Sequence, residues 1–309
     1  MTASVSGGLA SSGPIPALDP DRESRDTLLY EAILIKLAYL ILAQRCPTHL
    51  IRLVDRLEDG QSWFFIHWDL KAAKGTREEL WAKLSRRKNL RFVNPQVCVS
   101  RDFSWVEGTL AGIRAVLESQ VAFDYVALLS GEDYPIRSKA RILAHLEAKN
   151  GQELLPHFSL VAKNRWDDQG IDSFSRLRHP HLRLGRLNLR LRITRRFPEG
   201  MEPFGGSKWW CLTLDCIRYI EEYVRLNPEY SRYFRRVYSP EEIFFHTLIL
   251  NSKFRNRVMN EGWDHESRGP LGLEDFDTLA RSSALFARRF DDSKSLAILD
   301  RIDRELLIW

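Results

Sequence analysis

Apolar runs and amphipathic segments alternate along the first half of the chain. Runs with the length and composition of buried strands span residues 38–43, 63–69, 90–93 and 123–130. Segments whose apolar positions recur at helical spacing span residues 46–57, 76–87, 103–119 and 138–148. Because strands and helices alternate in this order, the pattern predicts an α/β fold with a mostly parallel central sheet flanked by helices.

Polar side chains follow two of the predicted strands. His67 and Asp69 lie at the end of one strand, and Asp133 comes shortly after another. Ligands of mostly parallel sheets bind outside the carboxyl ends of the strands. We therefore expect a binding site where these two strand ends meet.

The N-terminal segment has a different composition. Residues 1–27 are rich in serine, glycine and proline and have no basic stretch followed by an apolar core, so we expect a disordered tail and no secretory signal. The apolar run 28–43 contains Glu31 and Lys36 and is too short to span a bilayer, which favours a buried strand. The four cysteines match no zinc-site spacing, and as reduced thiols they suit a cytoplasmic protein.

The chain carries a formal net charge of +5, and many of its arginines lie in one stretch. Residues 176–196 contain eight of them: Arg176, Arg178, Arg183, Arg186, Arg190, Arg192, Arg195 and Arg196. One interpretation is a solvated basic helical face. The other is a contact with the inner membrane surface or with a polyanion.

Several common catalytic motifs are absent. The sequence has no P-loop, no GxGxxG fingerprint, no GxSxG elbow and no HExxH helix. Asp-x-Asp occurs only at 19–21, in the predicted tail, and at 275–277, in a predicted helix. A single Asp133 after a central strand is a poor site for a hard cation, so we expect no metal. Arginines such as Arg288 and Arg289 are suited to neutralising a diphosphate instead.

Glu242 has two interpretations on local grounds. It stands in the segment YSPEEIFFHT, where Ser239 fits a helix N-cap, Pro240 fits the first turn and Glu242 fits the third position of a capping box. A glutamate at a helix N-terminus is also biased towards its ionised form, which suits a general base. The local pattern leaves both interpretations open.

Six segments carry a family resemblance. In order, they are AYLILAQ, FFIHWDLKA, ALLSGEDYPIRS, GSKWWCLT, YSPEEIFFHTLILNS and LFARRFD, and the resemblance that they carry covers roughly residues 35–292. In this order they resemble the core-2/I-branching β-1,6-N-acetylglucosaminyltransferase and peptide O-xylosyltransferase family. The resemblance implies a GT-A-like fold in a single domain, 28–309, with a nucleotide-binding half at about 28–135 and an acceptor-binding half at about 136–309.

The resemblance also implies an activity and its residues. It implies an inverting, metal-independent transfer from a UDP-sugar, with N-acetylglucosamine favoured and xylose the alternative, onto a hydroxyl of a glycan or lipid-linked glycan. No nucleic acid is expected. Glu242 is then the general base. Donor and diphosphate contacts fall on Arg289, Arg257, His67 and Asp69, and acceptor or sugar contacts on Asp133, Trp209 and Trp210.

The sequence departs from the family pattern at two places. Ser100-Arg101-Asp102 replaces a tryptophan-containing turn, and Lys208 replaces an acidic or amide residue before the tryptophan pair. The family's Golgi members carry a membrane anchor that this chain lacks, which suggests a bacterial, cytoplasmic member. The alternative functions are a non-catalytic basic module that binds RNA or an anionic membrane through 176–196, and a degenerate protein that binds a UDP-sugar without transferring it.

Overall fold

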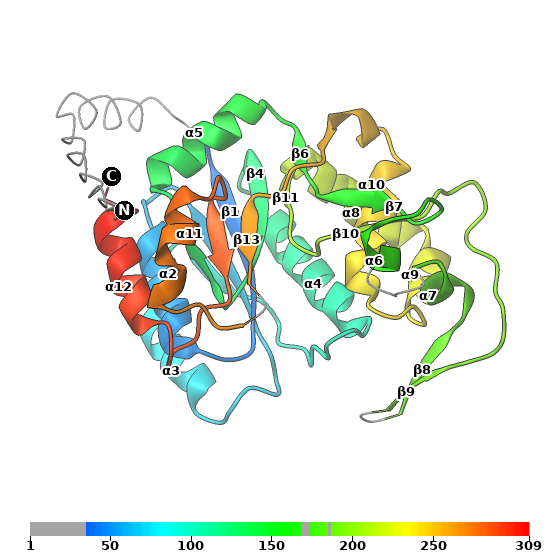
Figure 1. Cartoon of the computed structure of the whole chain (residues 1–309), viewed down its shortest axis with the longest axis horizontal. Helices are drawn as coiled ribbons and strands as arrows, with labels where there is room; N and C mark the ends of the chain where they lie inside the picture. Colours follow the sequence, from blue (N-terminus) through cyan, green and yellow to red (C-terminus); the bar gives the residue numbers. More distant parts are fainter. Residues whose placement is uncertain (1–34, 169–172, 185–186, 268, 309) are drawn as a thin grey trace, which may run out of the picture.

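The computed structural model describes residues 35–168, 173–184, 187–267 and 269–308, so the predicted tail lies outside the described residues. Its centre is a seven-stranded sheet in the order β12-β6-β11-β4-β1-β2-β3 (Figure 1). The strands are β1 (Leu37–Ala43), β2 (Trp63–Trp68), β3 (Leu90–Phe92), β4 (Tyr125–Ser130), β6 (Glu153–Leu154), β11 (Cys211–Thr213) and β12 (Val258–Met259). β1 pairs in parallel with β2 and β4, and β2 with β3, whereas β11 is antiparallel to β4 and β6. The predicted α/β class, with mostly parallel central strands flanked by helices, is confirmed.

The central strand β1 is buried on both faces. Tyr39 and Ile41 belong to one hydrophobic cluster, and Leu40 and Leu42 to another. Successive side chains of a strand point to opposite faces of the sheet, so the near-continuous apolar sequence of β1 supplies both cores. This arrangement fixes the position of the carboxyl end of β1, where the candidate site lies.

Helices cover both faces of the sheet. One face packs against α2 (Pro47–Leu57), α3 (Thr76–Leu84), α5 (Lys139–Lys149), α11 (Phe276–Arg281) and α12 (Leu296–Glu305). The other packs against α4 (Ser104–Glu118), α8 (Leu214–Leu226), α9 (Pro228–Phe234) and α10 (Phe244–Leu250). Helix α4 approaches β1 closely, because a Cβ atom at Gly112 would lie 2.2 Å from Leu40 Cδ1. Only glycine permits that approach.

A second, three-stranded sheet joins distant segments of the chain. Its strands are β13 (Asp264–Glu266), β14 (Phe286–Arg288) and β5 (Asp133–Pro135), with β14 in the middle. The register sets Glu266 and Asp133 opposite Arg288 on its two sides. This sheet, which was not predicted from the sequence, brings the carboxylates of β13 and β5 to Arg288, the last residue of β14.

The remaining elements are short. They are β7 (His157–Ser159), β10 (Phe204–Gly206), α6 (Arg165–Asp168), α7 (Ser175–Arg178), β8 (His181–Leu184), β9 (Leu187–Arg190) and the 3₁₀ turns η1 (Pro240–Glu242), η2 (Arg255–Arg257) and η3 (Leu273–Asp275). The interpretation of 176–196 as a helical face is wrong, since α7 ends at Arg178 and a β8–β9 hairpin follows. Within the described ranges, no helix is both long and apolar enough to cross a bilayer.

Candidate active site

Two adjoining cavities open at the carboxyl ends of β1 and β4. The first, of about 240 Å³, is lined by Leu42 and Ser130 from these strand ends, and we call it the strand-end cavity. The second, of about 560 Å³, is lined by Glu242, and we call it the glutamate cavity. The residues that line both are Ser100, Lys208, Trp209, Glu266 and Arg289. A cavity therefore lies at the strand ends where a site was expected, and Glu242 and Arg289 face a common space.

The turn after β4 shapes the floor of the strand-end cavity. A Cβ atom at Gly131 would lie 2.5 Å from the Cβ atom of Ala43, so the backbones of the two strand ends touch. Asp133 fastens this turn by accepting hydrogen bonds from Ser130 N at 2.8 Å and Ser130 Oγ at 2.7 Å. Asp133 is buried and lines neither cavity. It therefore does not reach the acceptor as expected, and instead supports the turn that forms the cavity floor.

Arg288 is buried among carboxylates. Its Nε donates to Asp133 at 2.6 Å, its Nη2 donates to Asp264 at 2.6 Å, and its Nη1 lies 3.7 Å from Glu266. Burial opposes the charge of Arg288, but the neighbouring Asp133 and Asp264 raise its pKa. Burial raises the pKa of Asp264 to about 6. The guanidinium also lies 4.1 Å from the ring centroid of Trp209 and lines the strand-end cavity.

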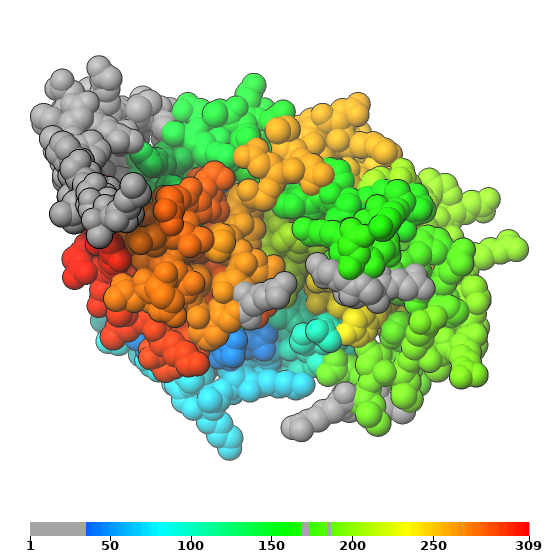
Figure 2. Space-filling model, viewed as in Figure 1, coloured from blue at the N-terminus to red at the C-terminus, as the bar shows by residue number. Residues whose placement is uncertain are grey.

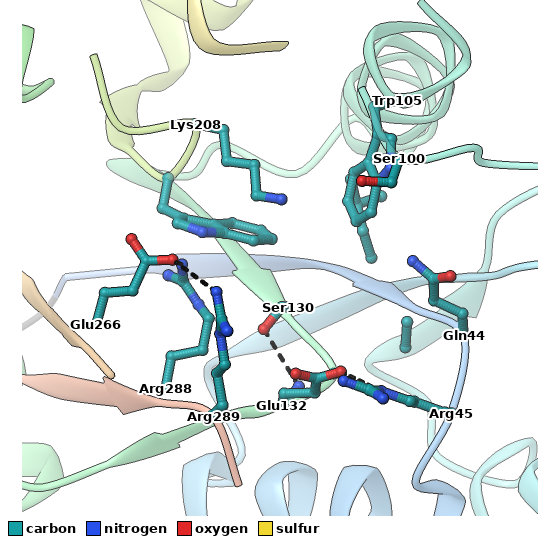
Figure 3. A pocket seen from close by; sticks show the side chains of 14 residues that line it. Gln44, Arg45, Ser100, Trp105, Ser130, Glu132, Lys208, Glu266, Arg288 and Arg289 are labelled. Atoms are coloured by element: carbon teal, nitrogen blue, oxygen red, sulfur yellow. Dashed lines mark hydrogen bonds and ion pairs between the residues drawn. The ribbon is translucent and has the colours of Figure 1, made fainter. Parts of the chain in front are cut away.

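Arg289 is the more accessible of the two arginines. Its side chain is 43% exposed, and its Nη2 lies 3.6 Å from Glu266 Oε1. Figure 3 shows Arg288, Arg289 and Lys208 around the same space, with Glu266 beside both arginines. Because a guanidinium offers several donors in a fixed plane, this pair can bind phosphate oxygens from the wall of the cavity.

Glu242 does not form the predicted capping box. Ser239 has a left-handed backbone (φ 51°) and makes no side-chain cap, and Pro240–Glu242 forms the 3₁₀ turn η1. Helix α10 begins only at Phe244. The turn η1 takes the place of the N-terminal helical turn that the sequence pattern indicated. The Glu242 side chain lines the glutamate cavity and does not cap a helix.

Glu242 is held by an arginine from a distant part of the chain. Arg176 Nη1 donates to Glu242 Oε2 at 2.9 Å. The Arg176 guanidinium lies 4.2 Å from the ring centroid of Trp166 and 5.5 Å from that of Tyr238. Arg176 is only 8% exposed, although the sequence analysis treated it as one of eight basic surface residues. No local spacing distinguishes it from the other seven arginines.

Two further ionisable residues, Glu241 and Lys208, line the glutamate cavity together with Glu242. Glu241 lines the glutamate cavity, is buried, and has no hydrogen-bond partner for its Oε2 atom. Burial raises its pKa to about 7. Lys208 places its ammonium group 4.4 Å from the ring centroid of Trp105 and 5.0 Å from that of Trp209. Burial lowers the pKa of Lys208, which is the residue that departs from the family pattern.

The two adjacent tryptophans have different surroundings. Trp209 lines both cavities, and its ring contacts Arg288 and Lys208. Trp210 is fully buried and packs against Phe245, with ring centroids 6.0 Å apart. The sugar contact of Trp209 stays a prediction for a residue that lines both cavities, whereas Trp210 belongs to the core.

His67 and Asp69 support the site from outside the two cavities. His67 is buried at the end of β2, and its Nε2 accepts a hydrogen bond from Gln96 N at 3.1 Å. Asp69 accepts from Lys71 N at 2.7 Å and from Cys98 N at 3.0 Å. Burial lowers the pKa of His67. The two side chains order the loops after β2 and β3, and neither lines the strand-end or the glutamate cavity.

Arg257 lies elsewhere in the molecule. It donates to Gly151 O through Nε at 3.0 Å, and its Nη2 lies 3.4 Å from the buried Glu153. It lines a separate surface depression together with Asp215 and Lys253. The structure therefore does not bring Arg257 to the other predicted residues. The 3₁₀ turn η2 places it at the edge of the main sheet that β12 and β6 form, away from the ends of β1 and β4.

Comparisons with known proteins agree on a family. Residues 37–267 match the family model "Branch: Core-2/I-Branching enzyme". The chain is 25% identical over 304 residues to xylosyltransferase 2 of Canis lupus familiaris, covering 88% of this chain and 34% of the relative. It is 26% identical over 277 residues to the β-glucuronosyltransferase GlcAT14C of Arabidopsis thaliana, covering 83% and 70%. The chain thus spans about a third of the length of the xylosyltransferases that it matches.

Among solved structures, the galactosyltransferase LgtC with donor and acceptor sugar analogues superposes with a TM-score of 0.40 at 13% identity, covering 84% of this chain and 88% of LgtC.

The family match spans most of the described chain and includes the strand ends, the tryptophan pair and Glu242. The resemblance inferred from the sequence is confirmed: the chain belongs to the Core-2/I-Branching enzyme family of glycosyltransferases.

Proposed function

We propose that this protein is an inverting glycosyltransferase that moves a sugar from a UDP-sugar to an acceptor hydroxyl, with Glu242 as general base. The observation that carries the proposal is that Glu242 and Arg289 line one cavity. A carboxylate and a guanidinium that face one cavity can act on the acceptor hydroxyl and on the leaving diphosphate, respectively. A cavity of about 560 Å³ is also in the range of small-molecule sites.

The proposed step needs one base and one stabilised leaving group. Glu242 accepts the proton of the acceptor hydroxyl while that oxygen forms a bond to the anomeric carbon. The bond between the anomeric carbon and the diphosphate oxygen breaks on the opposite face, and its electron pair leaves with UDP. Attack and departure on opposite faces invert the anomeric configuration. Arg176 binds Oε2, and in this proposal the other carboxylate oxygen, Oε1, receives the proton.

Arginines supply the positive charge for the leaving diphosphate in this proposal. Arg289 reaches the cavity wall, and Arg288 lies behind it on the face of Trp209. Fixed charges near a developing anion are a large source of catalytic stabilisation. The carboxylates Asp133 and Asp264, which a divalent ion would need, are already bound to Arg288. This pairing supports a metal-independent reaction, because the Arg288 guanidinium already neutralises the acidic cluster.

The donor sugar is the finer part of the proposal. The sequence resemblance favours N-acetylglucosamine, with xylose as the alternative. The relatives are named for xylose and glucuronic acid, which adds the latter to the candidates. The proposed acceptor is a hydroxyl of a glycan or a lipid-linked glycan. Lys208, close to Glu242 in the glutamate cavity, is placed to contact whichever group enters there.

A thermal-shift panel of UDP-sugars, each with and without EDTA, tests the donor and the metal together. We expect one UDP-sugar to raise the melting temperature equally in both conditions. That donor is then used to measure sugar transfer, or slow donor hydrolysis, by wild type and by Glu242→Gln. The base role predicts a loss of about 10²–10⁴-fold in turnover with donor binding retained. Exposed Glu229→Gln is the control, and full activity in Glu242→Gln would refute the assignment.

A further inference from the structure

The β8–β9 hairpin has two chemically different sides. Its register pairs Leu182 with Leu189, His181 with Arg190, and Arg183 with Asn188. Directly opposed residues project from the same side of an antiparallel pair, and successive residues alternate. The leucines therefore share one side of the hairpin, and His181, Arg183, Asn188 and Arg190 share the other.

Two side chains of the polar side, His181 and Arg183, contact the rest of the protein, although Arg183 is itself exposed. Arg183 Nη1 donates to Ser100 O at 3.0 Å, and the His181 ring lies 5.2 Å from the ring of Tyr238. On the other side, Leu182, Leu187 and Leu189 are 42%, 65% and 44% exposed. This is the reverse of the usual arrangement, in which the apolar side of a strand packs on the core.

An outward apolar hairpin indicates a binding surface. Figures 1 and 2 show the hairpin at the edge of the molecule, projecting away from the central sheet. Ile193, just after the hairpin, is 65% exposed and extends the apolar surface. An isolated two-stranded hairpin is marginally stable in water, and clustered exposed aliphatic side chains mark interaction sites.

The charge around this surface specifies the kind of partner. No aspartate or glutamate occurs between residues 173 and 198. Exposed arginines outside the polar side of the hairpin lie near the leucines in the sequence: Arg178, Arg192 and Arg196. A surface that combines exposed aliphatic side chains with exposed arginines is complementary to an anionic lipid bilayer, whose headgroups carry phosphate and whose interior accepts the leucines.

We propose that the β8–β9 hairpin docks this protein onto an anionic membrane surface, with Leu182, Leu187 and Leu189 entering the interface and the flanking arginines contacting phosphate headgroups. A second copy of the chain fits less well, since two arginine-rich surfaces repel each other. Single-stranded nucleic acid also fits less well, because its bases stack on aromatic rings and the outward side presents leucines.

The hairpin is connected to the rim of the candidate active site. Ser100, which accepts the hydrogen bond from Arg183, lines both cavities. Tyr238, which packs on His181, precedes Ser239 of the glutamate cavity. Docking would bring this rim close to the bilayer, where an acceptor with a lipid anchor resides. The docking itself requires no sugar transfer, so it and the proposed function can fail separately.

Vesicle flotation of the full chain tests the proposal. The probes are vesicles of phosphatidylcholine alone and of phosphatidylcholine mixed with phosphatidylglycerol. We expect binding to the mixed vesicles only, weakening as salt is raised. The triple variant Leu182→Ser/Leu187→Ser/Leu189→Ser should lose binding. Each arginine near an anionic surface contributes a factor of about five to affinity, so Arg192→Glu/Arg196→Glu should weaken binding by more than about 30-fold.

Matched controls separate docking from general surface changes. Leu226→Ser and Leu273→Ser remove exposed leucines elsewhere, and Arg77→Glu/Arg86→Glu makes the same charge change outside the hairpin. Each should bind as wild type does, and thermal unfolding should show all variants folded. Absence of wild-type binding to mixed vesicles would overturn the proposal, as would equal binding by the hairpin variants. Equal binding to neutral vesicles would also overturn it, and concentration-dependent dimers lost in the triple variant would assign the surface to a second copy.

Discussion

Arg176 Nη1 lies 2.9 Å from Glu242 Oε2, so a buried guanidinium holds one oxygen of the proposed general base. The ring of Trp166 covers that guanidinium at 4.2 Å and limits its movement. The pair joins a helix that begins at Ser175 to a turn that ends at Glu242. The orientation of the base therefore depends on a residue that is distant in sequence and lies beside the β8–β9 hairpin.

Arg176→Met should reduce turnover by misplacing Glu242. We expect a loss of about 10²-fold in kcat, because small displacements of a catalytic group have effects of that size. The KM for the donor should change little, since Arg176 lines neither the strand-end nor the glutamate cavity. Steady-state kinetics checks both parameters. Arg176→Lys should recover part of the activity, and exposed Arg225→Met is the control. An unchanged kcat in Arg176→Met would contradict a positioning role.

Arg288 and Arg289 should have separable effects. Arg288→Met leaves Asp133 and Asp264 buried without their partner, which should cost about 3–5 kcal/mol of unfolding free energy. Arg289→Met removes a half-exposed side chain whose contribution to stability we expect to be below about 1 kcal/mol. Its loss should instead lower kcat/KM by about 10²–10³-fold, because a charge facing the diphosphate is missing.

Urea unfolding and donor titration of the two variants distinguish these effects. Arg289→Lys serves as the conservative control, since it keeps the charge without the planar fork. A stable Arg288→Met protein would show that the acidic cluster tolerates the loss by protonating. A fully active Arg289→Met protein would remove Arg289 from the proposed diphosphate site.

Glu241 should make stability depend on pH. Its folded-state pKa is about 7, raised by burial from an ordinary value of 4.5. Between these two values the folded state retains a proton that the unfolded state releases. The free energy of unfolding should therefore fall as pH rises from 4.5 to about 7 and then level off, by roughly 3 kcal/mol in total.

Glu241→Gln removes that titration, so its stability should decline less with pH across the same interval. Urea unfolding of wild type and variant over a pH series measures the difference. Glu229→Gln, on the exposed start of α9, controls for the loss of one carboxylate. Parallel pH profiles for wild type and Glu241→Gln would show that the Glu241 carboxyl does not hold its proton as burial implies.

The central layers of the fold could be predicted because their pattern is local. The apolar runs and helical spacings located β1, β2, β4 and α4 to within a few residues, since burial on both sheet faces leaves a continuous apolar signal. The small sheet of β13, β14 and β5 could not be found in this way. Its strands have three residues each and come from three distant segments, so their pairing leaves no periodic signal.

The candidate site could also be predicted only in part. Glu242 and Arg289 were located from family motifs, and the structure brings them to one cavity. His67, Asp69 and Asp133 were correctly associated with strand ends, but their oxygen and nitrogen atoms bind neighbouring loops and Arg288. Sequence position shows that a polar side chain lies near a strand end, whereas its direction depends on contacts made by tertiary packing.

The structure separates Arg257 from the donor site inferred by resemblance. Its guanidinium binds Gly151 O and lies beside Glu153, a carboxylate that is buried and also accepts hydrogen bonds from Thr213. Arg257→Met should therefore lower the unfolding free energy by about 1–3 kcal/mol, since Gly151 O and Glu153 lose their charged partner. The KM for the donor should stay within about twofold of wild type.

Thermal unfolding and donor kinetics of Arg257→Met check the two halves of this expectation. Arg255→Met, on the same 3₁₀ turn, is the matched control, because its ion pair with Glu202 is exposed at the surface. The change in stability and the change in donor KM lead to different conclusions. A stable Arg257→Met protein with a donor KM raised about tenfold would return Arg257 to the diphosphate site. That result would require β12 and the turn before it to move towards β1 when the donor binds, since in this structure they lie at the far edge of the sheet.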